Sequence, residues 1–190
     1  MSDKSYLSVY AKSFSWAGFF LPGKTLKKCS VLYDFCRVAD NIADDKDEIE
    51  VKEKKFAKFE NDFNQKKFDN LIIKNMWDIM EEFNISIRIV QDLLAGIKSD
   101  IKERVELNSK KDLLIYSYRV AGTVGLMMAK ILNVTKKNSL KSAIDLGIAM
   151  QLTNISRDVL EDSKNNRFYI EENFEKISST VNLANRYYQD

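Results

Sequence analysis

Turn-forming residues are scarce along this chain, and their scarcity constrains the fold more than any other feature. One proline and six glycines serve all 190 residues. A sheet of many strands needs more turns than these residues supply, whereas helix-forming residues are abundant. The sequence therefore predicts an all-α fold. A chain of 190 residues that is 45% hydrophobic also suits one helical domain over residues 1–190.

Apolar side chains recur every three or four residues, which predicts a series of amphipathic helices. Pro22 marks a boundary between the first two, and Ser86 is placed to cap a later one. Residues 106–111 predict a connection, and residues 167–170 interrupt the helical pattern. The expected helices cover about 6–20 and 25–43, pass through 56–63 and 71–80, run from 86 towards 102, cover 112–132 and 139–162, and begin again near 178.

The composition excludes several classes of function. The chain has no histidine, which removes Ser-His-Asp and Cys-His nucleophile systems and histidine zinc sites. Its formal net charge of +2 gives no field that would steer it onto nucleic acid, so no nucleic-acid partner is expected. The first residues lack the features of a signal peptide, which favours a cytoplasmic location. Chemistry must rest on carboxylates, arginines and tyrosines.

A polar stripe follows one face of the helix expected at 25–43. Tyr33, Arg37, Asp40 and Asp44 are spaced by four, three and four residues, so they share that face. The residues around them, from Val31 to Ile42, are mostly of the core type. A polar stripe in such apolar surroundings indicates a lined site.

The helix expected at 139–162 repeats this design. Gln151, Asn154, Asp158 and Asp162 step by three, four and four residues, with Arg157 beside them. The other positions of this segment are largely apolar. Two such stripes can face each other across a helical bundle.

Each aspartate pair places like charges at i and i+4, which destabilises an isolated helix by roughly 0.2–0.5 kcal/mol. Mg²⁺ compensates such repulsion, because it prefers oxygen ligands and is commonly shared between one or two carboxylates and a phosphate. Arg37 and Arg157 add bidentate donors for phosphate oxygens. A single pair would more simply be a solvated acidic face. Two pairs, each with an arginine, favour a site where Mg²⁺ holds a diphosphate that departs.

These stripes belong to a wider set of motifs that resembles the squalene and phytoene synthases, which join two prenyl diphosphates head to head. SFS (13–15) resembles the opening motif of that family, and YDFCRVADNIAD (33–44) its first aspartate-rich motif. YSYRVAGTVG (116–125) resembles the central motif, QLTNISRDVLED (151–162) the second aspartate-rich motif, and RFYI (167–170) its tail. Between 46 and 110 the resemblance is loose, with Gly96 and Asp100 matching a weaker feature.

The resemblance implies an isoprenoid-synthase-type helical bundle with a central cavity, in which C-terminal helices are missing because family domains continue beyond Asp190. It implies Mg²⁺, with Mn²⁺ as an alternative ion, and prenyl diphosphate substrates. By that resemblance the metal ligands are Asp40, Asp44, Asn154, Asp158 and Asp162; the catalytic residues are Asp40, Asp44, Asp158, Asp162, Tyr116 and Arg157; and the substrate-binding residues are Lys12, Ser13, Tyr33, Arg37, Tyr116, Gln151, Asn154, Arg157 and Tyr169.

Residues 125–129 and 145–149 look most like bacterial phytoene synthases, which condense two geranylgeranyl diphosphates through a cyclopropyl diphosphate without a nicotinamide cofactor. Phe14, Val120, Ala121 and Met127 are expected to wall the apolar site. The alternatives are a squalene or dehydrosqualene synthase that uses farnesyl diphosphate, a non-catalytic relative such as an assembly factor, and a helical interaction module with surface aspartates. A lipid-soluble product also suggests peripheral contact with the inner membrane.

Overall fold

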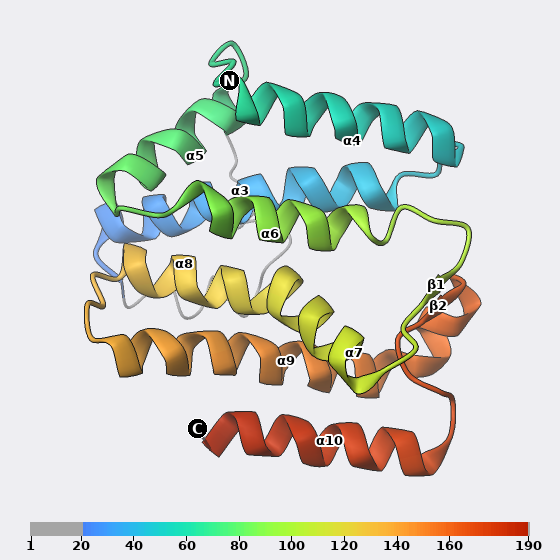
Figure 1. The fold of residues 1–190 in the computed structure, drawn as a ribbon. Coiled ribbons are helices and arrows are strands. Elements are labelled where there is room, and N and C mark those ends of the chain that lie inside the picture. Colours follow the sequence, from blue (N-terminus) through green and yellow to red (C-terminus); the bar gives the residue numbers. More distant parts are fainter. Residues whose placement is uncertain (1–20, 190) are drawn as a thin grey trace.

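The computed structural model describes residues 21–189, so the helix expected at about 6–20 lies outside the described residues. Long helices lie roughly side by side in layers, with α4 and α5 on one side of the bundle and α10 on the other (Figure 1). The elements in chain order are α3 (Gly23–Asp44), α4 (Ile49–Asn64), α5 (Leu71–Glu82), α6 (Ile87–Lys98), β1 (Val105–Glu106), α7 (Lys110–Ser117), η1 (Tyr118–Gly122), α8 (Thr123–Ile131), α9 (Lys137–Lys164), β2 (Arg167–Phe168) and α10 (Phe174–Gln189).

Several helices of this protein end at an asparagine, where glycine is the usual residue in other proteins. No described glycine has a positive φ, whereas Asn84, Asn133 and Asn166 have φ of 49°, 62° and 57° just beyond α5, α8 and α9. Asparagine tolerates this left-handed conformation, which terminates helices and releases the chain into a turn. The few glycines of the sequence therefore suffice for a bundle of many helices.

Helix starts agree with the sequence in part. Pro22 precedes α3, and the Ser86 hydroxyl accepts a hydrogen bond from the backbone N–H of Arg88, as expected for a cap. Two boundaries were misplaced: α6 ends at Lys98, before residue 102, and α10 begins at Phe174, before 178. The earlier start of α10 is explained by Asn173, whose side chain accepts a hydrogen bond from the Lys176 N–H at 2.8 Å.

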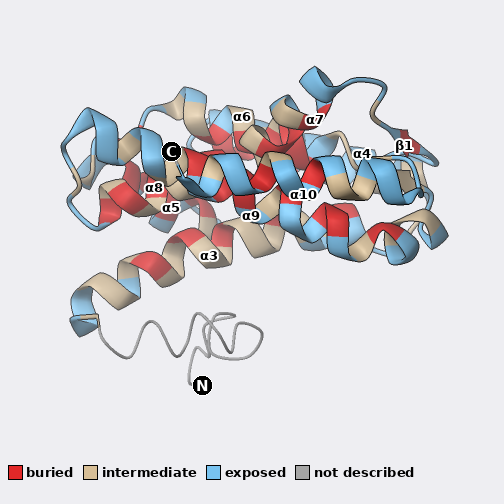
Figure 2. Cartoon of the chain, turned by 90° about the horizontal axis from the view of Figure 1, so that it is seen from below, coloured by how far each residue is buried: buried red, intermediate tan, exposed pale blue. Residues whose placement is uncertain are grey.

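Buried residues, red in Figure 2, occur along the helices of the bundle. Their apolar side chains form two clusters. The larger cluster joins α3, α4, α5 and α6 around Phe35, whose ring lies 5.4 Å from those of Phe59 and Phe63. The smaller cluster joins α7, α9, α10 and the segment after β2. The α8 helix adds Met127 and Ile131 to the larger cluster while it packs along α9. The α8 helix therefore packs against the larger cluster on one side and against α9 on another.

The long helix expected at 112–132 contains a five-residue π-helical turn, η1, between α7 and α8. This turn is packed tightly against its neighbours, because a Cβ added at Gly96 of α6 would lie 2.7 Å from the Cβ of Arg119. The Thr123 hydroxyl donates to the Arg119 carbonyl at 2.6 Å and helps satisfy the altered backbone. Such turns widen a helix locally and are frequent at functional sites.

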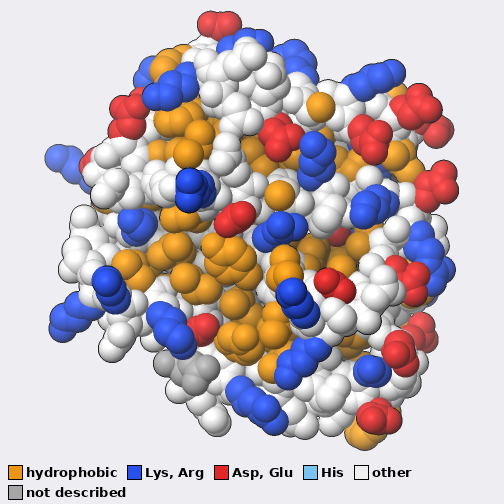
Figure 3. Space-filling model, viewed as in Figure 1, with side chains coloured by type: hydrophobic (Ala, Val, Ile, Leu, Met, Phe, Trp, Pro, Cys, Tyr) orange, Lys and Arg blue, Asp and Glu red, His pale blue; other side chains and the backbone are white. Residues whose placement is uncertain are grey.

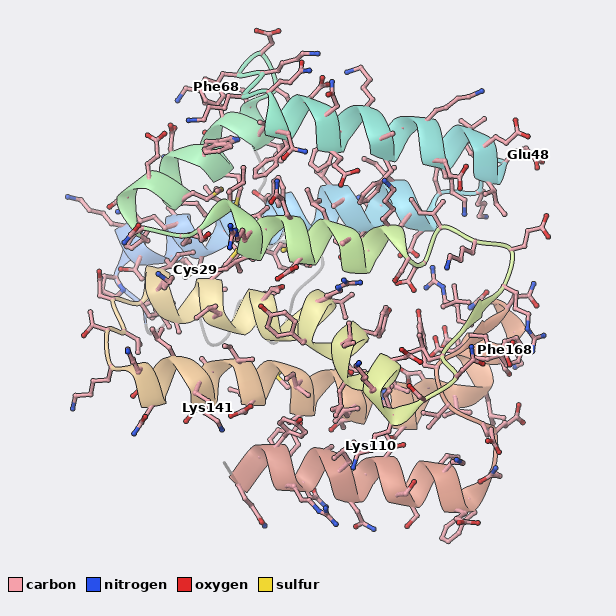
Figure 4. The ribbon with its side chains drawn as sticks, in the orientation of Figure 1. Cys29, Glu48, Phe68, Lys110, Lys141 and Phe168 are labelled. Atoms are coloured by element: carbon pink, nitrogen blue, oxygen red, sulfur yellow. The ribbon has the colours of Figure 1, made fainter. Side chains whose placement is uncertain are left out.

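A two-residue parallel bridge, which the sequence did not predict, ties two distant connections together. The Val105 N–H donates to the Asn166 carbonyl at 2.9 Å and the Leu107 N–H to the Phe168 carbonyl at 3.1 Å. Phe168 lies at this end of the bundle, away from Lys141 on α9 (Figure 4), with the Arg104 guanidinium 4.1 Å from its ring centre. The bridge fixes the course of residues 167–170.

Hydrophobic side chains remain visible at the surface, where they gather across the middle of the face shown in Figure 3 with lysines and arginines around them. Large apolar residues are exposed on the two last helices of the structure, among them Leu146, Met150 and Leu160 of α9 and Phe174 of α10. Within residues 21–189, none of the helices combines the length and the apolar character needed to cross a bilayer.

The close contact between η1 and α9 predicts that a methyl group added at Gly147 lowers the stability of the fold. In Gly147→Ala the new Cβ would lie 2.4 Å from the Ala121 carbonyl oxygen, so the two helices must move apart. We expect a loss of about 1–3 kcal/mol in the free energy of unfolding, as for other overpacked sites, measured by urea denaturation. Gly23→Ala is the control, because no atom lies within 4 Å of its added Cβ. Equal stability of the two variants would contradict the close packing.

Candidate active site

The two aspartates of α3 differ in their surroundings. Asp40 is half-buried, and Asp44 is exposed at the end of the helix. Burial and the negative charge of Asp44 raise the pKa of Asp40 to about 6, although the positive charge of Arg37 opposes this. The ionised form of Asp40 is therefore disfavoured until a positive charge approaches.

Arg167 of β2 supplies part of that positive charge. Its Nη2 donates to Asp44 Oδ1 at 2.6 Å, joining residues 123 positions apart in the sequence. Burial raises the pKa values of Asp40, Asp100 and Asp162, and the charge of Arg167 limits that rise. Burial alone would lower the pKa of Arg167, but the hydrogen bond to Asp44 and these charges raise it above its usual range. Arg167 thus bonds Asp44 of α3 and lies beside Asp162 of α9.

The stripe on α9 contains an ion pair between Arg157 and Asp158. Arg157 grips Asp158 with two hydrogen bonds, from Nε to Oδ1 at 2.7 Å and from Nη2 to Oδ2 at 2.5 Å. These bonds lower the pKa of Asp158. One turn further along, burial and the Asp158 charge raise the pKa of Asp162. Arg157 is exposed, so an incoming anion could reach it.

Two buried tyrosines, Tyr116 and Tyr169, converge on the half-buried carboxylate of Asp100. The Tyr116 hydroxyl donates to Asp100 Oδ2 at 2.8 Å, and the Tyr169 hydroxyl donates to Asp100 Oδ1 at 3.0 Å. The two hydroxyls are 3.0 Å apart, and the rings stack at 4.7 Å. Burial and the Asp100 charge raise the pKa of both tyrosines, while burial raises that of Asp100. Both tyrosines consequently keep their protons.

An apolar groove of about 410 Å³ runs between α8 and α9. Val120 and Ala121 line it, as expected from the sequence, whereas Met127 is fully buried in the larger core cluster and forms no part of its wall. Gln151 and Asn154 close one end. Because Asn154 stands one turn before Asp158 on α9, this polar end of the groove leads toward Asp158.

The remaining predicted residues are placed as follows. Tyr33 and Arg37 are half-buried on α3, on the face that carries Asp40. Lys12 and Ser13, with the proposed wall residue Phe14, lie outside the described residues. The sequence assigned no role to Asp100 or Arg167. Both stand in segments that match family motifs, but their partners in the structure, Tyr116 and Tyr169 for Asp100 and Asp44 for Arg167, lie far from them in the sequence.

The donor set fits a hard divalent cation without forming a ready-made cage for one. Among residues 21–189, no three acidic or cysteine side chains converge as metal ligands would. Asp44 is paired with Arg167, and Asp158 with Arg157, so both carboxylates are turned toward cations. Mg²⁺ needs only one or two carboxylates when phosphate and water complete its octahedron. Paired oxygen donors on two helices meet that requirement.

The tyrosine cluster can be tested by removing one hydroxyl. Tyr116→Phe leaves half-buried Asp100 with one fewer donor, so we expect a loss of about 1–3 kcal/mol in the free energy of unfolding. Tyr118→Phe is the matched control, since its hydroxyl lies 3.4 Å from Asp92 and is only part-buried. Denaturant titrations compare the two. Similar small losses in both variants would mean that the cluster contributes little to stability.

Known proteins share both the sequence pattern and the fold. The squalene/phytoene synthase family model matches residues 7–174. The chain is 33% identical to the 15-cis-phytoene synthase of Enterobacter agglomerans over 86% of its length, and 31% identical to that of Pantoea ananas over 86%. It spans 59% and 57% of those relatives.

Among solved structures, a dehydrosqualene synthase in complex with ligand matches 97% of this chain and 72% of its own, with a TM-score of 0.77 and 27% identity. Squalene synthase HpnC from Alicyclobacillus acidocaldarius matches with a TM-score of 0.66 at 17% identity, a likeness of fold alone. The helical bundle is thus the one found in these synthases. With its two aspartate stripes and its matched motifs, the chain belongs to the squalene/phytoene synthase family.

Proposed function

We propose that this protein is a Mg²⁺-dependent prenyltransferase that condenses two geranylgeranyl diphosphates head to head to phytoene and releases diphosphate. One observation carries the proposal, namely that charged residues and an apolar groove lie next to each other. Arg167 donates a hydrogen bond to Asp44 of α3, and its positive charge limits the rise in the pKa of Asp162 on α9. The apolar groove ends on the same helix, at Asn154. A site with an acidic end and an apolar length suits a molecule with a diphosphate head and a hydrocarbon tail.

At the acidic end, Asp40, Asp44, Asn154, Asp158 and Asp162 would hold the metal. When bound, Mg²⁺ would neutralise the diphosphate and favour its departure. Arg157 is charged and exposed. When its hydrogen bonds to Asp158 break, its guanidinium can donate to the diphosphate oxygens instead. Arg37 stands on the Asp40 face of α3 and would bind the same group.

The chemistry requires a dry site for carbocations. Ionisation breaks the bond between C1 and oxygen of one substrate, and the electron pair leaves with the diphosphate. The allylic cation adds to the double bond of the second substrate, and loss of a proton closes a cyclopropyl diphosphate. The apolar walls at Val120 and Ala121 would keep water from these cations.

The second half of the reaction ionises the cyclopropyl diphosphate, rearranges it and ends by losing a proton. No hydride enters, so phytoene synthesis needs no nicotinamide cofactor. Tyr116 and Tyr169 keep their protons and donate hydrogen bonds to Asp100, so they are poor bases and would take part through their oriented rings and hydroxyl oxygens.

A second candidate activity has an observation of its own. The solved structure that matches 97% of this chain is a dehydrosqualene synthase, and such an activity would start from farnesyl diphosphate. Incubation of the protein with Mg²⁺ and each diphosphate separates the two activities, because phytoene has forty carbons and dehydrosqualene thirty.

We place the enzyme in the cytoplasm, where its lipid-soluble product favours peripheral contact with the inner membrane.

The metal site can be tested without turnover. Mg²⁺ and pyrophosphate together should raise the unfolding temperature, because a ligand that binds only the folded state stabilises it by about 2.7 kcal/mol at a hundredfold excess over Kd. Asp158→Asn removes a proposed metal ligand and should abolish most of this rise in a thermal-shift assay.

Glu161→Gln is the matched control, since Glu161 is an exposed acid of the same helix that no part of the proposal uses. It should respond to Mg²⁺ and pyrophosphate like the wild type. A wild-type protein that shows no joint effect of the two ligands, or an Asp158→Asn variant that responds fully, would contradict the proposed metal role.

Asp40 gives a second test through pH. Its pKa is raised in the folded protein, so the folded state holds this proton more tightly than the unfolded state. The metal-free protein should therefore lose stability as pH rises from about 4 to 6. Asp40→Asn removes this loss and should be more stable than wild type at pH 7, on the order of 2 kcal/mol, and no more stable at pH 4.

Urea titrations at both pH values measure the difference in stability between Asp40→Asn and the wild type. With Mg²⁺ and pyrophosphate added at pH 7, the wild type should become the more stable protein, because only the wild type keeps the carboxylate that binds the metal. Asp45→Asn is a contrasting control, since its hydrogen bond with Lys55 lowers the pKa of Asp45. An Asp40→Asn variant that is less stable than wild type at pH 7 without metal would contradict the proposed cost of ionised Asp40.

A further inference from the structure

The groove between α8 and α9 has a measurable length. These helices are consecutive, joined by the short connection that follows Ile131, and they pack along each other. The groove wall on α9 extends from Asn154 back to Ser139. At 1.5 Å per residue, those fifteen residues span roughly 22 Å.

That length can be compared with prenyl chains. With carbon–carbon bonds of about 1.5 Å, an extended chain of sixteen backbone carbons, as in geranylgeranyl, spans roughly 19 Å and one of twelve, as in farnesyl, roughly 14 Å. Ala143 lies eleven residues from Asn154, or roughly 16 Å along the helix. A chain that starts at Asn154 therefore ends before Ala143 if it is farnesyl and passes it if it is geranylgeranyl.

We infer that Ala143 is the specificity-determining position that admits the fourth isoprene unit. This inference rests on the proposed function and gives that site its substrate length. Ala143 is half-buried and lines the groove, and its small side chain leaves the passage open. Its backbone is fixed against α8, because a Cβ at Gly125 would lie 2.2 Å from the Ala143 carbonyl oxygen. A larger side chain at position 143 cannot be accommodated by moving α9 away without breaking this contact.

The opposite wall supports the same boundary. Beyond Met128, the groove continues past Ala129 to Leu132 and Val134, so apolar surface remains available where the last isoprene unit would lie. Leu132 is 43% exposed, which leaves the far end of the groove open. Ser139, roughly 22 Å from Asn154 along α9, lies beyond the end of a geranylgeranyl chain.

The test uses the 190-residue protein, Mg²⁺ and two unreactive probes, farnesyl and geranylgeranyl S-thiolodiphosphate, with affinities from titration calorimetry. Wild type should bind both. Ala143→Phe should weaken the geranylgeranyl probe at least about tenfold, the size of a pocket's discrimination over small apolar groups, and leave the farnesyl probe within about twofold. Ala143→Leu should give a smaller change of the same kind.

Ser139→Phe is the matched control and should leave both affinities within about twofold of wild type. Thermal unfolding checks that each variant folds. If Ala143→Phe does not fold, the affinities of Ala143→Leu for the two probes provide the test. Equal weakening of both probes, or of neither, would overturn the role of Ala143 while the proposed function stands. Failure of the wild type to bind either probe would instead overturn the proposed function, and this inference with it.

Discussion

The ion pair between Arg167 and Asp44 is the contact on which the candidate site depends. It joins the end of α3 to the segment that follows α9, two parts of the chain 123 residues apart. Without a cation at this point, Asp40, Asp44, Asp100 and Asp162 would place several negative charges in a partly buried region. Such charges are tolerated only when they are paired, so the position of Arg167 determines how closely the two acidic helices can approach.

Arg167 owes its position to the backbone bridge on one side and to the side-chain contacts of Tyr169 on the other. The bridge between β1 and β2 fixes residues 167 and 168, and the stacked ring and hydroxyl of Tyr169 anchor the next residue against Tyr116 and Asp100. The guanidinium therefore points to the acidic residues because its neighbours on both sides are held. A divalent cation would face the same carboxylates. In the family reaction, metal and arginine would share one set of negative charges, which links metal binding to the contact between α3 and β2.

The sequence predicts the parts of this structure that depend on local periodicity. Helices α3 and α9 and the two aspartate stripes follow from spacings of three and four residues. The bridge at Val105 and Arg167 could not be predicted, because two-residue strands leave no periodic signal and pair across sixty residues. The π-helical turn at Tyr118–Gly122 also escapes periodicity, since it arises from packing against α6 and α9. Asp100 was missed for a related reason: its partners come from distant helices and connections.

The same distinction explains why family membership leaves the substrate length open. At the proposed diphosphate end, charged residues stand at fixed helical spacings, because metal and phosphate accept few alternative ligands. The groove is apolar, and apolar side chains of similar volume, such as leucine and methionine, can replace one another there with little change in stability. A substitution that alters length leaves no motif behind. Substrate length must therefore be inferred from distances along the groove, where one methyl group at position 143 lies between the ends of the two candidate chains.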